Sequence, residues 1–578
     1  MISNMSKMRD LIVLIILTLL VSVPGLSSLT VIDRDESRYA QATVQMLETG
    51  EYVDIRFQDA PRWKKPAGAY WAQAASIKTM SALGLSTPDA RAIWVHRFPS
   101  VLAAILAVLA TYFGGAKLVG RDGAFFGAMI LAVSLSMMFE AHIAKTDALL
   151  TAFSTVCLAS LCYLRSGAAV KRAAFIFWLS LGLAVMMKGP ITPVIILTGL
   201  LALFIWERNG AWMKPLISPF GIVAFIIIVA PWTWLIWEKT GGDFFTVAVS
   251  EDLAPKMSGQ SENHGGPVGY YLLTVWAMFW PGTAFLLAGL SLALRSARNA
   301  RKAKKAGRDI PQAMPRAARL LLCWAVPWWI IVEIAPTKLP HYTLPVYPAL
   351  ALLAGTAAAV MIAGREFPAS RRVGVVMFAL IGAVLTAGLI GAQSVYGVAP
   401  TWEFAAGAII IAAIVAGAVL IWALPVRPVL RRLGVYCVIA SGAALGALSF
   451  GRILPAATDL SVSKNVAKVL TDAGYDLPLK QGTAVLSPSY AEPSLVYYLG
   501  THIHLGGAAD MQDITALPAG TLVLADRLHK KGAPVIDAVL KAAKDKSACF
   551  ETLGTIDGLN YSKGDDVILT VMRATACP

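Results

Sequence analysis

The sequence predicts a polytopic α-helical membrane protein with about thirteen transmembrane helices and a soluble α/β domain at its C-terminal end. Only 15% of the 578 residues are charged, against about 25% in soluble domains, and 57% are hydrophobic. Apolar stretches of about 20 residues recur up to about residue 455, where the hydropathy collapses. This composition excludes a cytosolic globular enzyme, a disordered chain and a disulfide-framework protein.

Thirteen apolar stretches are long enough to cross a bilayer. They are residues 11–30, 92–116, 123–139, 146–164, 173–187, 190–206, 216–237, 268–293, 318–335, 341–363, 373–393, 404–424 and 430–450. We expect the first to be a retained anchor, because no small-residue cleavage site followed by a polar segment is apparent after it. An odd number of crossings predicts that the two termini lie on opposite sides of the membrane.

The basic residues fix the predicted orientation. Lys7 and Arg9 precede the first stretch, and every second loop after it is rich in Lys and Arg, above all the loop 295–319. Cytoplasmic loops carry this bias, so we predict a cytoplasmic N-terminus and a C-terminal domain outside. The net charge of +15 belongs to these loops, so we expect membrane lipids and no nucleic acid as partners.

Two outer loops are long. Residues 31–91 contain two predicted helices, 35–48 and 69–83. In the first, Tyr39 and Met46 fall on one face, which predicts a helix lying in the membrane interface. Residues 238–267 form a second outer loop, polar and rich in glycine.

The domain predicted over residues 455–578 has about 120 residues, a normal size for one domain. Predicted strands are 483–486, 503–505, 521–525 and 567–571, and predicted helices are 463–473, 492–499 and 534–545. Cys549 and Cys577 lie in this domain, and the sequence leaves open whether they form a disulfide. The other four cysteines lie in predicted spans, as apolar fillers.

Five cations on the outer side are not explained by topology. They are Arg38, Lys65, Lys145, Lys188 and Lys338. Cations beside polar aromatics at a bilayer surface suit a lipid phosphate, whereas Asp35 and Asp147 make sense as catalytic groups. Structural alternatives are a helix cap with an Asp35–Arg38 salt bridge, a helix cap at Asp147, and a basic interfacial anchor at Lys64–Lys65.

These residues resemble a known family. The motifs that carry the resemblance are Asp35-Glu36-Ser37-Arg38-Tyr39-Ala40, Lys65-Pro66 with Tyr70-Trp71, Arg97-Phe98-Pro99-Ser100, Lys145-Thr146-Asp147-Ala148, Lys188-Gly189-Pro190 and Lys338-Leu339-Pro340-His341-Tyr342. Their order is similar to that in GT-C membrane glycosyltransferases of the protein O-mannosyltransferase-like superfamily, and most like the branch of lipid A aminoarabinose transferases. Ala67 departs from an expected double proline, and the outer domain has no matching motif.

The resemblance implies residues 1–454 as a GT-C transmembrane domain and residues 455–578 as a periplasmic domain of a bacterial inner-membrane enzyme. It implies transfer of a sugar, 4-amino-4-deoxy-L-arabinose in that branch, from a polyprenyl phosphate donor to a lipid A phosphate, with inversion. Asp35 and Asp147 are the predicted catalytic residues. The predicted substrate-binding residues are Arg38, Tyr39, Lys65, Tyr70, Lys145, Lys188, His264, Lys338, His341 and Tyr342.

Two other functions stay open. The acceptor could be Ser or Thr of a protein, for which Asp35 would act as a true base. A lipid or solute transporter is less favoured, because the sequence has no internal repeat and its polar residues gather at one membrane face. We predict no obligatory metal, because the five cations can neutralise one phosphate; Asp33-Arg34-Asp35, and Glu262 with His264, leave a divalent cation open.

Overall fold

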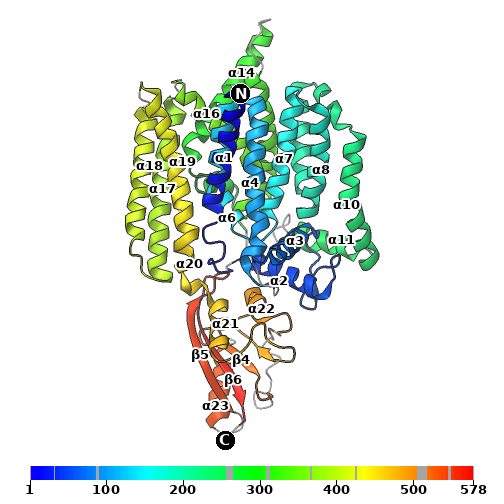
Figure 1. The fold of residues 1–578 in the computed structure, drawn as a ribbon, viewed down its shortest axis with the longest axis vertical. Helices are drawn as coiled ribbons and strands as arrows, with labels where there is room; N and C mark the ends of the chain where they lie inside the picture. The colour runs from blue at the N-terminus through cyan, green and yellow to red at the C-terminus, as the bar shows by residue number, and fades with distance from the viewer. Residues whose placement is uncertain are drawn as a thin grey trace.

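The computed structural model describes most of the chain. The described residues are 2–31, 33–85, 90–255, 265–306, 313–364, 368–423, 426–503, 505, 517–530, 532–544 and 549–576. Long helices run side by side in one layer, and the C-terminal strands and short helices project from one face of it (Figure 1). The N-terminus lies at the opposite face. The two ends of the chain thus lie on opposite sides of the helical layer, as an odd number of crossings requires.

The helical layer contains nine helices that are long and apolar enough to span a membrane, counted over the described residues, or ten if one bent pair is a single span. The nine lie in α4 (Ile93–Leu118), α7 (Asp147–Ser166), α8 (Val170–Lys188), α10 (Pro219–Thr240), α15 (Ala313–Ile334), α16 (Tyr347–Ile362) with its preceding 3₁₀ turn η3 (Pro340–Val346), α17 (Pro368–Tyr396), α18 (Glu403–Ala423) and α19 (Pro428–Leu448). The bent pair is α5 (Arg121–Ala132) with α6 (Leu135–Ala141), at 58°.

The predicted count of thirteen spans is not confirmed, although a helix forms in every predicted stretch. The stretch 11–30 yields α1 (Ile2–Ser22), which ends before Pro24 and Gly25 and carries Lys7, Arg9 and Asp10 in its first half. Helix α9 (Ile191–Glu207) is short. The stretch 268–293 is broken at Pro281-Gly282 into α13 (Tyr270–Met278) and α14 (Thr283–Lys305). A hydropathy average does not reveal such a break, because the residues on both sides of it are apolar.

Two short helices and a hairpin lie between the helical layer and the C-terminal elements. They are α2 (Arg34–Thr49), β1 (Arg56–Phe57), β2 (Ala60–Pro61) and α3 (Gly68–Ala82). Asp33 caps α2 by accepting bonds from the amides of Asp35 and Glu36, and Gly50 ends it in the left-handed conformation with φ 73°. The helices therefore form where the sequence predicts them.

The polar side of α2 is buried as well as its apolar side, contrary to the predicted helix on a membrane surface. Gln41 and Gln45 are buried together with Tyr39 and Met46. The Gln41 amide donates to the Thr501 hydroxyl at 2.7 Å. The helix is enclosed because the C-terminal elements cover the face that the prediction assigned to water.

Residues 462–576, which we call the C-terminal unit, contain a four-stranded sheet in the order β3-β4-β6-β5. Its elements are α21 (Val462–Asp472), β3 (Val485–Leu486), α22 (Pro493–Leu499), β4 (Leu522–Asp526), α23 (Ala533–Lys544), β5 (Cys549–Leu559) and β6 (Asp566–Thr575). The β3–β4 pair is parallel and the other pairs are antiparallel. The unit has its own apolar core around Leu470, Leu495 and Leu569.

One strand prediction in this unit is wrong, and one strand was missed. Neither Ile503 nor Leu505 lies in a strand, and β5 was not predicted. Strand β5 contains Gly554 and Gly558 and is mostly half-buried or exposed, so its sequence lacks the alternation that marks a strand. Cys549 at its start is disulfide-bonded, and Cys577, the candidate partner that the sequence left open, lies outside the described residues.

Polar contacts fix the C-terminal unit to α2 and to the loop before α4. Both oxygens of the Glu492 carboxylate accept hydrogen bonds from the Arg34 guanidinium, at 2.8 and 3.0 Å. The guanidinium of Arg91 donates to the Tyr497 carbonyl, and the Tyr497 hydroxyl donates to the Arg91 carbonyl, each at 2.6 Å. The unit therefore helps to position the first turn of α2.

Candidate functional site

Most of the predicted site residues lie in elements that meet at the face of the helical layer that carries α2 and α3 (Figure 1). They come from the first two turns of α2, the start of α3, the loop 142–146 and the first residue of α7, the last residue of α8 and the η3 turn. Elements far apart in the sequence therefore converge on one region.

A buried ion pair fixes the geometry of this region. The guanidinium of Arg97 on α4 donates to both oxygens of Glu36 on α2, at 2.7 and 2.8 Å, and the two side chains are 0% and 1% exposed. Glu36 also accepts a bond from the Ala144 amide at 2.9 Å. The pair joins α4, α2 and the loop before α7, which is a role that the sequence motif alone did not reveal.

Asp35 faces two guanidinium groups. Its Oδ1 lies 3.8 Å from Nη1 of Arg38 and 3.7 Å from Nη2 of Arg62. The Asp35 side chain is 58% exposed, whereas Arg62 is 11% exposed. Burial raises the pKa of Asp35, but Arg62, Lys145 and Arg38 outweigh it and the net pKa is lowered, so this carboxyl is ionised near neutral pH.

Arg62 was not among the predicted site residues. Its side chain lies over the ring of Tyr39, with Cζ 4.9 Å from the ring centroid, and its Nε donates to the Tyr70 hydroxyl at 2.8 Å. Tyr39 and Tyr70 stack with their centroids 4.8 Å apart. Burial raises the pKa of both phenols, so both remain neutral. They stabilise the charged Arg62 through the cation–π contact with Tyr39 and the hydrogen bond to Tyr70.

A second charged group lies around Asp147. The Lys188 ammonium donates to Asp147 Oδ1 at 2.6 Å, and His341 Nε2 lies 3.8 Å from the same oxygen. Lys188 also lies over the ring of Tyr342, 5.7 Å from its centroid. Asp147 is not the helix cap: Thr146 is the N-cap of α7, and Asp147 is the first helical residue. The ion pair, and not a cap, explains the buried carboxylate.

Lys145 connects the two groups through carboxylates. Its ammonium lies 3.2 Å from Glu140 Oε1 and 3.6 Å from Asp33 Oδ2. Burial lowers the pKa of Lys145, but the carboxylates outweigh it and raise the pKa. Glu140 is 1% exposed, lies 3.7 Å from His341 Nδ1, and its Oε2 has no hydrogen-bond partner among the described residues.

Glu140 was also missed by sequence reasoning. The sequence does contain a signal for it. Glu140 directly follows the apolar stretch 123–139, and an ionisable residue at the end of a membrane span is a candidate functional residue because it is costly to bury. Its closeness to Lys145 and His341 depends on the bend between α5 and α6.

The remaining predicted residues are distributed differently. Lys65 lies half-buried in the turn between β2 and α3. Lys338 donates to the carbonyls of Val332 and Glu333 at the end of α15, at 3.0 and 2.5 Å, where a cation suits the helix terminus. His264 lies outside the described residues.

The cations of this face are paired with carboxylates or carbonyls more fully than the sequence suggested. Lys145, Lys188 and Lys338 all have internal partners. These carboxylate and carbonyl partners account for three cations that topology does not explain. The site is a charge-balanced network, with the carboxylates Asp33, Asp35, Glu140 and Asp147 facing Arg38, Arg62, Lys145 and Lys188. Such a network holds its groups in fixed positions and presents both signs of charge.

Comparison with known proteins gives matches in sequence and in structure. Residues 65–237 match the family described as dolichyl-phosphate-mannose-protein mannosyltransferase. The chain is 26% identical over 355 residues to the undecaprenyl phosphate-alpha-4-amino-4-deoxy-L-arabinose arabinosyl transferase of Pectobacterium carotovorum subsp. carotovorum (strain PC1). It is 24% identical over 360 residues to the undecaprenyl phosphate-alpha-4-amino-4-deoxy-L-arabinose arabinosyl transferase 2 of Proteus mirabilis (strain HI4320). These alignments cover 61% of this chain and 59% and 60% of the relatives, so the chain spans about three fifths of their length.

The fold matches over nearly the whole chain. The crystal structure of ArnT from Cupriavidus metallidurans bound to undecaprenyl phosphate superposes with a TM-score of 0.69 at 18% identity, covering 97% of both chains. Its apo state gives the same TM-score and identity, covering 99% of this chain and 98% of that chain. The resemblance expected from the motifs is thereby confirmed: this chain has a GT-C glycosyltransferase fold and matches the protein mannosyltransferase family over residues 65–237.

Proposed function

We propose that this protein is a membrane glycosyltransferase that takes a sugar from a polyprenyl phosphate donor. The observation that carries the proposal is the network around Asp35, Arg38 and Arg62, on one face of a chain with the fold of an undecaprenyl phosphate-bound transferase. Similarity to transferases named for undecaprenyl phosphate aminoarabinose supports the donor and makes 4-amino-4-deoxy-L-arabinose the proposed sugar. The proposed acceptor is a lipid A phosphate.

Cations near the donor phosphate have a direct chemical role. When the bond between sugar and phosphate breaks, negative charge develops on the leaving phosphate, and fixed positive groups stabilise it. Arg38 is 30% exposed and is supported from one side by Asp35, and Lys65 lies half-buried in the neighbouring turn. We assign these two residues to the donor phosphate, and displacement from the opposite side of the sugar then inverts the anomeric carbon.

The lowered pKa of Asp35 favours a phosphate acceptor over a hydroxyl acceptor. A carboxylate whose pKa is lowered is a weak base, and abstraction of a proton from Ser or Thr requires a stronger one. A lipid A phosphate is already ionised near neutral pH and needs no base. In this reaction Asp35 orients the sugar and stabilises positive charge at the reacting carbon, and Asp147 is the second proposed catalytic carboxylate.

The proposed location is a bacterial inner membrane, with the N-terminus in the cytoplasm and the site on the periplasmic side. The Lys- and Arg-rich alternate loops and the opposite placement of the two chain ends support this orientation (Figure 1). Residues 1–454 are the proposed transferase domain, and residues 455–578 the proposed periplasmic domain.

Transfer to Ser or Thr of a protein is the second candidate, because the family that matches residues 65–237 is described as a protein mannosyltransferase. The two candidates share a donor class and differ in the acceptor. A reaction with lipid A and with a Ser/Thr peptide, under the same conditions, separates them.

The test uses purified protein in lipid nanodiscs with undecaprenyl phosphate aminoarabinose as the donor. We expect release of undecaprenyl phosphate and a mass increase of lipid A by one aminoarabinose. Mass gain on the peptide alone would favour the second candidate. An intact donor in the presence of either acceptor would refute the proposed transferase and favour a transporter. The Asp35→Asn variant is the control for enzyme-dependent release.

A further inference from the structure

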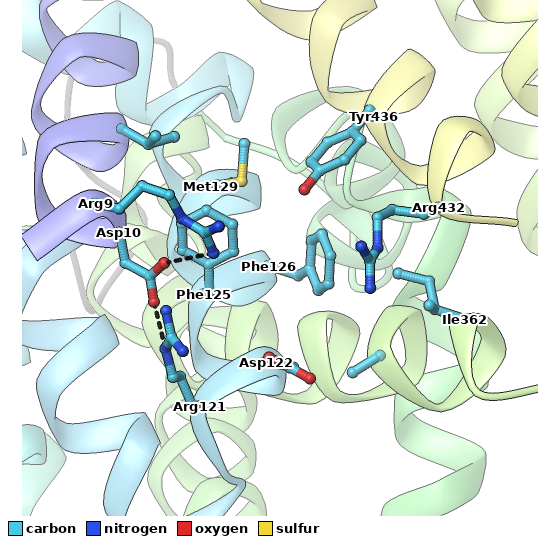
Figure 2. Close-up of a pocket in the computed structure, with 12 residues that line it drawn as sticks. Arg9, Asp10, Arg121, Asp122, Phe125, Phe126, Met129, Ile362, Arg432 and Tyr436 are labelled. Carbon is cyan, nitrogen blue, oxygen red and sulfur yellow. Dashed lines mark hydrogen bonds and ion pairs between the residues drawn. The ribbon is translucent and has the colours of Figure 1, made fainter. Parts of the chain in front are cut away.

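A cavity of about 440 Å³ is lined by residues of α1, α5, α16 and α19 (Figure 2). It lies toward the face of the helical layer that carries the N-terminus, opposite the face that carries α2 and α3 (Figure 1). Four helices line it, α1 with its first half, α5 and α19 with their N-terminal turns, and α16 with its C-terminal turn. Helix ends mark the boundary between the apolar interior of a membrane and water. The cavity therefore lies at the level where the phosphates of membrane lipids are found.

The cavity has an apolar floor and a charged rim. Val13, Phe125, Phe126 and Met129 are the main apolar groups, and Arg9, Arg121 and Arg432 supply three guanidinium groups against the carboxylates of Asp10 and Asp122. An apolar floor below a basic rim matches a lipid, whose chains are apolar and whose phosphate is anionic.

The carboxylate of Asp10 already has partners within the protein. Asp10 is 2% exposed and accepts bonds from Arg121 at 2.7 Å and from the Tyr112 hydroxyl at 2.9 Å. This group joins α1, α4 and α5 and explains Asp10 and Arg121 as structural residues. Arg9 lies 3.5 Å from Asp10 and is 74% exposed, so most of its guanidinium remains accessible.

Arg432 is the group that the structure leaves without a role. It projects from α19 into the cavity beside Phe126, and the Tyr436 hydroxyl points into the same space (Figure 2). Within the part of the chain that the structure describes, Arg432 makes no hydrogen bond or ion pair. The adjacent Arg431 has a buried Nε with no partner among the described residues. The buried Nε of Arg431 calls for an acceptor, whereas the guanidinium of Arg432 is exposed and therefore accessible to an anionic ligand in the cavity.

The surfaces beside the cavity suit acyl chains. Ile12 and Ile16 on α1 are 49% and 58% exposed, and Leu433 on α19 is 48% exposed. Both helices therefore present apolar side chains outward next to the basic rim. A lipid whose phosphate meets Arg432 can extend its chains along these side chains without leaving the membrane.

From these observations we infer that this cavity binds an anionic glycerophospholipid through its phosphate, with Arg432 and Arg9 as the cationic contacts and the Tyr436 hydroxyl as a further donor. Asp122 on the rim disfavours a second negative charge nearby, so the expected ligand carries a single phosphodiester. This site is on the other face of the protein from the proposed transfer reaction and does not depend on it.

The test is native mass spectrometry of the full-length protein, with phosphatidylglycerol as the probe and phosphatidylcholine as the neutral comparison. We expect selective retention of phosphatidylglycerol. The variant Arg432→Ala should retain it roughly fivefold less, because one basic residue near a lipid surface contributes about that factor. Arg432→Glu should weaken retention further. Arg427→Ala is the matched control, since Arg427 is also exposed at the start of α19 but does not line the cavity.

Three results would overturn the inference: equal retention of both lipids by the wild-type protein, equal losses in Arg432→Ala and Arg427→Ala, or displacement of phosphatidylglycerol by equimolar undecaprenyl phosphate. The last result would identify the occupant as a donor-type lipid. Retention is measured without any reaction, so failure of the transferase proposal would leave this measurement unaffected.

Discussion

The carboxylate of Asp35 lies within 4 Å of two guanidinium groups but is mostly exposed, 58% of its side chain being accessible. Asp35→Asn should therefore abolish transfer while the melting temperature changes little, because an exposed ion pair contributes little to stability. Donor turnover and thermal unfolding of the variant check this. Asp59→Asn, which changes another exposed carboxylate of the same segment, should keep wild-type turnover. Wild-type turnover in Asp35→Asn would refute the assigned role.

Lys65 and Lys64 are neighbours with different burial, half-buried and exposed respectively. A charge-assisted contact with a phosphate contributes about 1.5–3 kcal/mol, or roughly a ten- to hundredfold change in rate. Lys65→Ala should reduce kcat/KM by that factor, Lys65→Arg should retain part of it, and Lys64→Ala should be nearly silent. Equal losses at both lysines would point to general attraction of anionic lipid, and the phosphate assignment would fail.

Asp147 and Lys188 form a pair at 2.6 Å with side chains 7% and 13% exposed. Removing one partner leaves the other charge buried, which costs about 3–5 kcal/mol. Asp147→Asn should therefore lower both turnover and the melting temperature. In a double-mutant cycle of unfolding with Lys188→Met, the combined loss should be clearly smaller than the sum of the single losses. Additive losses would contradict the pairing.

At the scale of elements, α2 is fixed to α4 by Arg97 and Glu36, which have almost no exposure. Glu36→Gln should lower the melting temperature strongly, because it leaves the Arg97 guanidinium without its counter-charge. Thermal unfolding in detergent measures the loss. Glu48→Gln, at the exposed end of the same helix, is the control and should change stability little, although Glu48 pairs with Arg91 at 3.2 Å. Similar losses in both variants would contradict the structural role of the buried pair.

The elements that the sequence could predict are those with a local signal. The apolar stretches each contain a helix, and α2 and α3 form near the predicted limits. The bend between α5 and α6 and the break between α13 and α14 escaped prediction, since their flanking residues are equally apolar. Strand β5 escaped because its pairing with β6, and not its own pattern, makes it a strand.

The same distinction applies to the candidate site. Asp35, Arg38, Asp147 and Lys188 belong to short motifs and could be chosen from the sequence. Arg62 could not, because its contacts with Tyr39 and Tyr70 arise only when the hairpin folds back over α2. The partners of the lysines could not be predicted for a related reason: a sequence shows the sign of a charge but not the long-range partner that balances it.

At the scale of the whole molecule, Cys549 begins β5, and the register opposes it to Thr575, near Cys577 in the sequence. We predict that Cys549 is bonded to Cys577. The purified, unreduced protein should show a mobility shift on reduction that is absent from Cys577→Ala. Alkylation of Cys549 in the unreduced wild-type protein would refute the bond.

The enclosure of α2 between the helical layer and the C-terminal unit has an energetic consequence. Arg34 binds Glu492 of the unit, and the next residue is Asp35. A change in the orientation of the C-terminal unit should therefore change the position of Asp35, and the reverse should also hold. Any binding event that biases one must bias the other by the same free energy, in either direction. A ligand at Asp35 should thus slow hydrogen exchange around Glu492, and an antibody fragment on the unit should change donor affinity by a reciprocal factor.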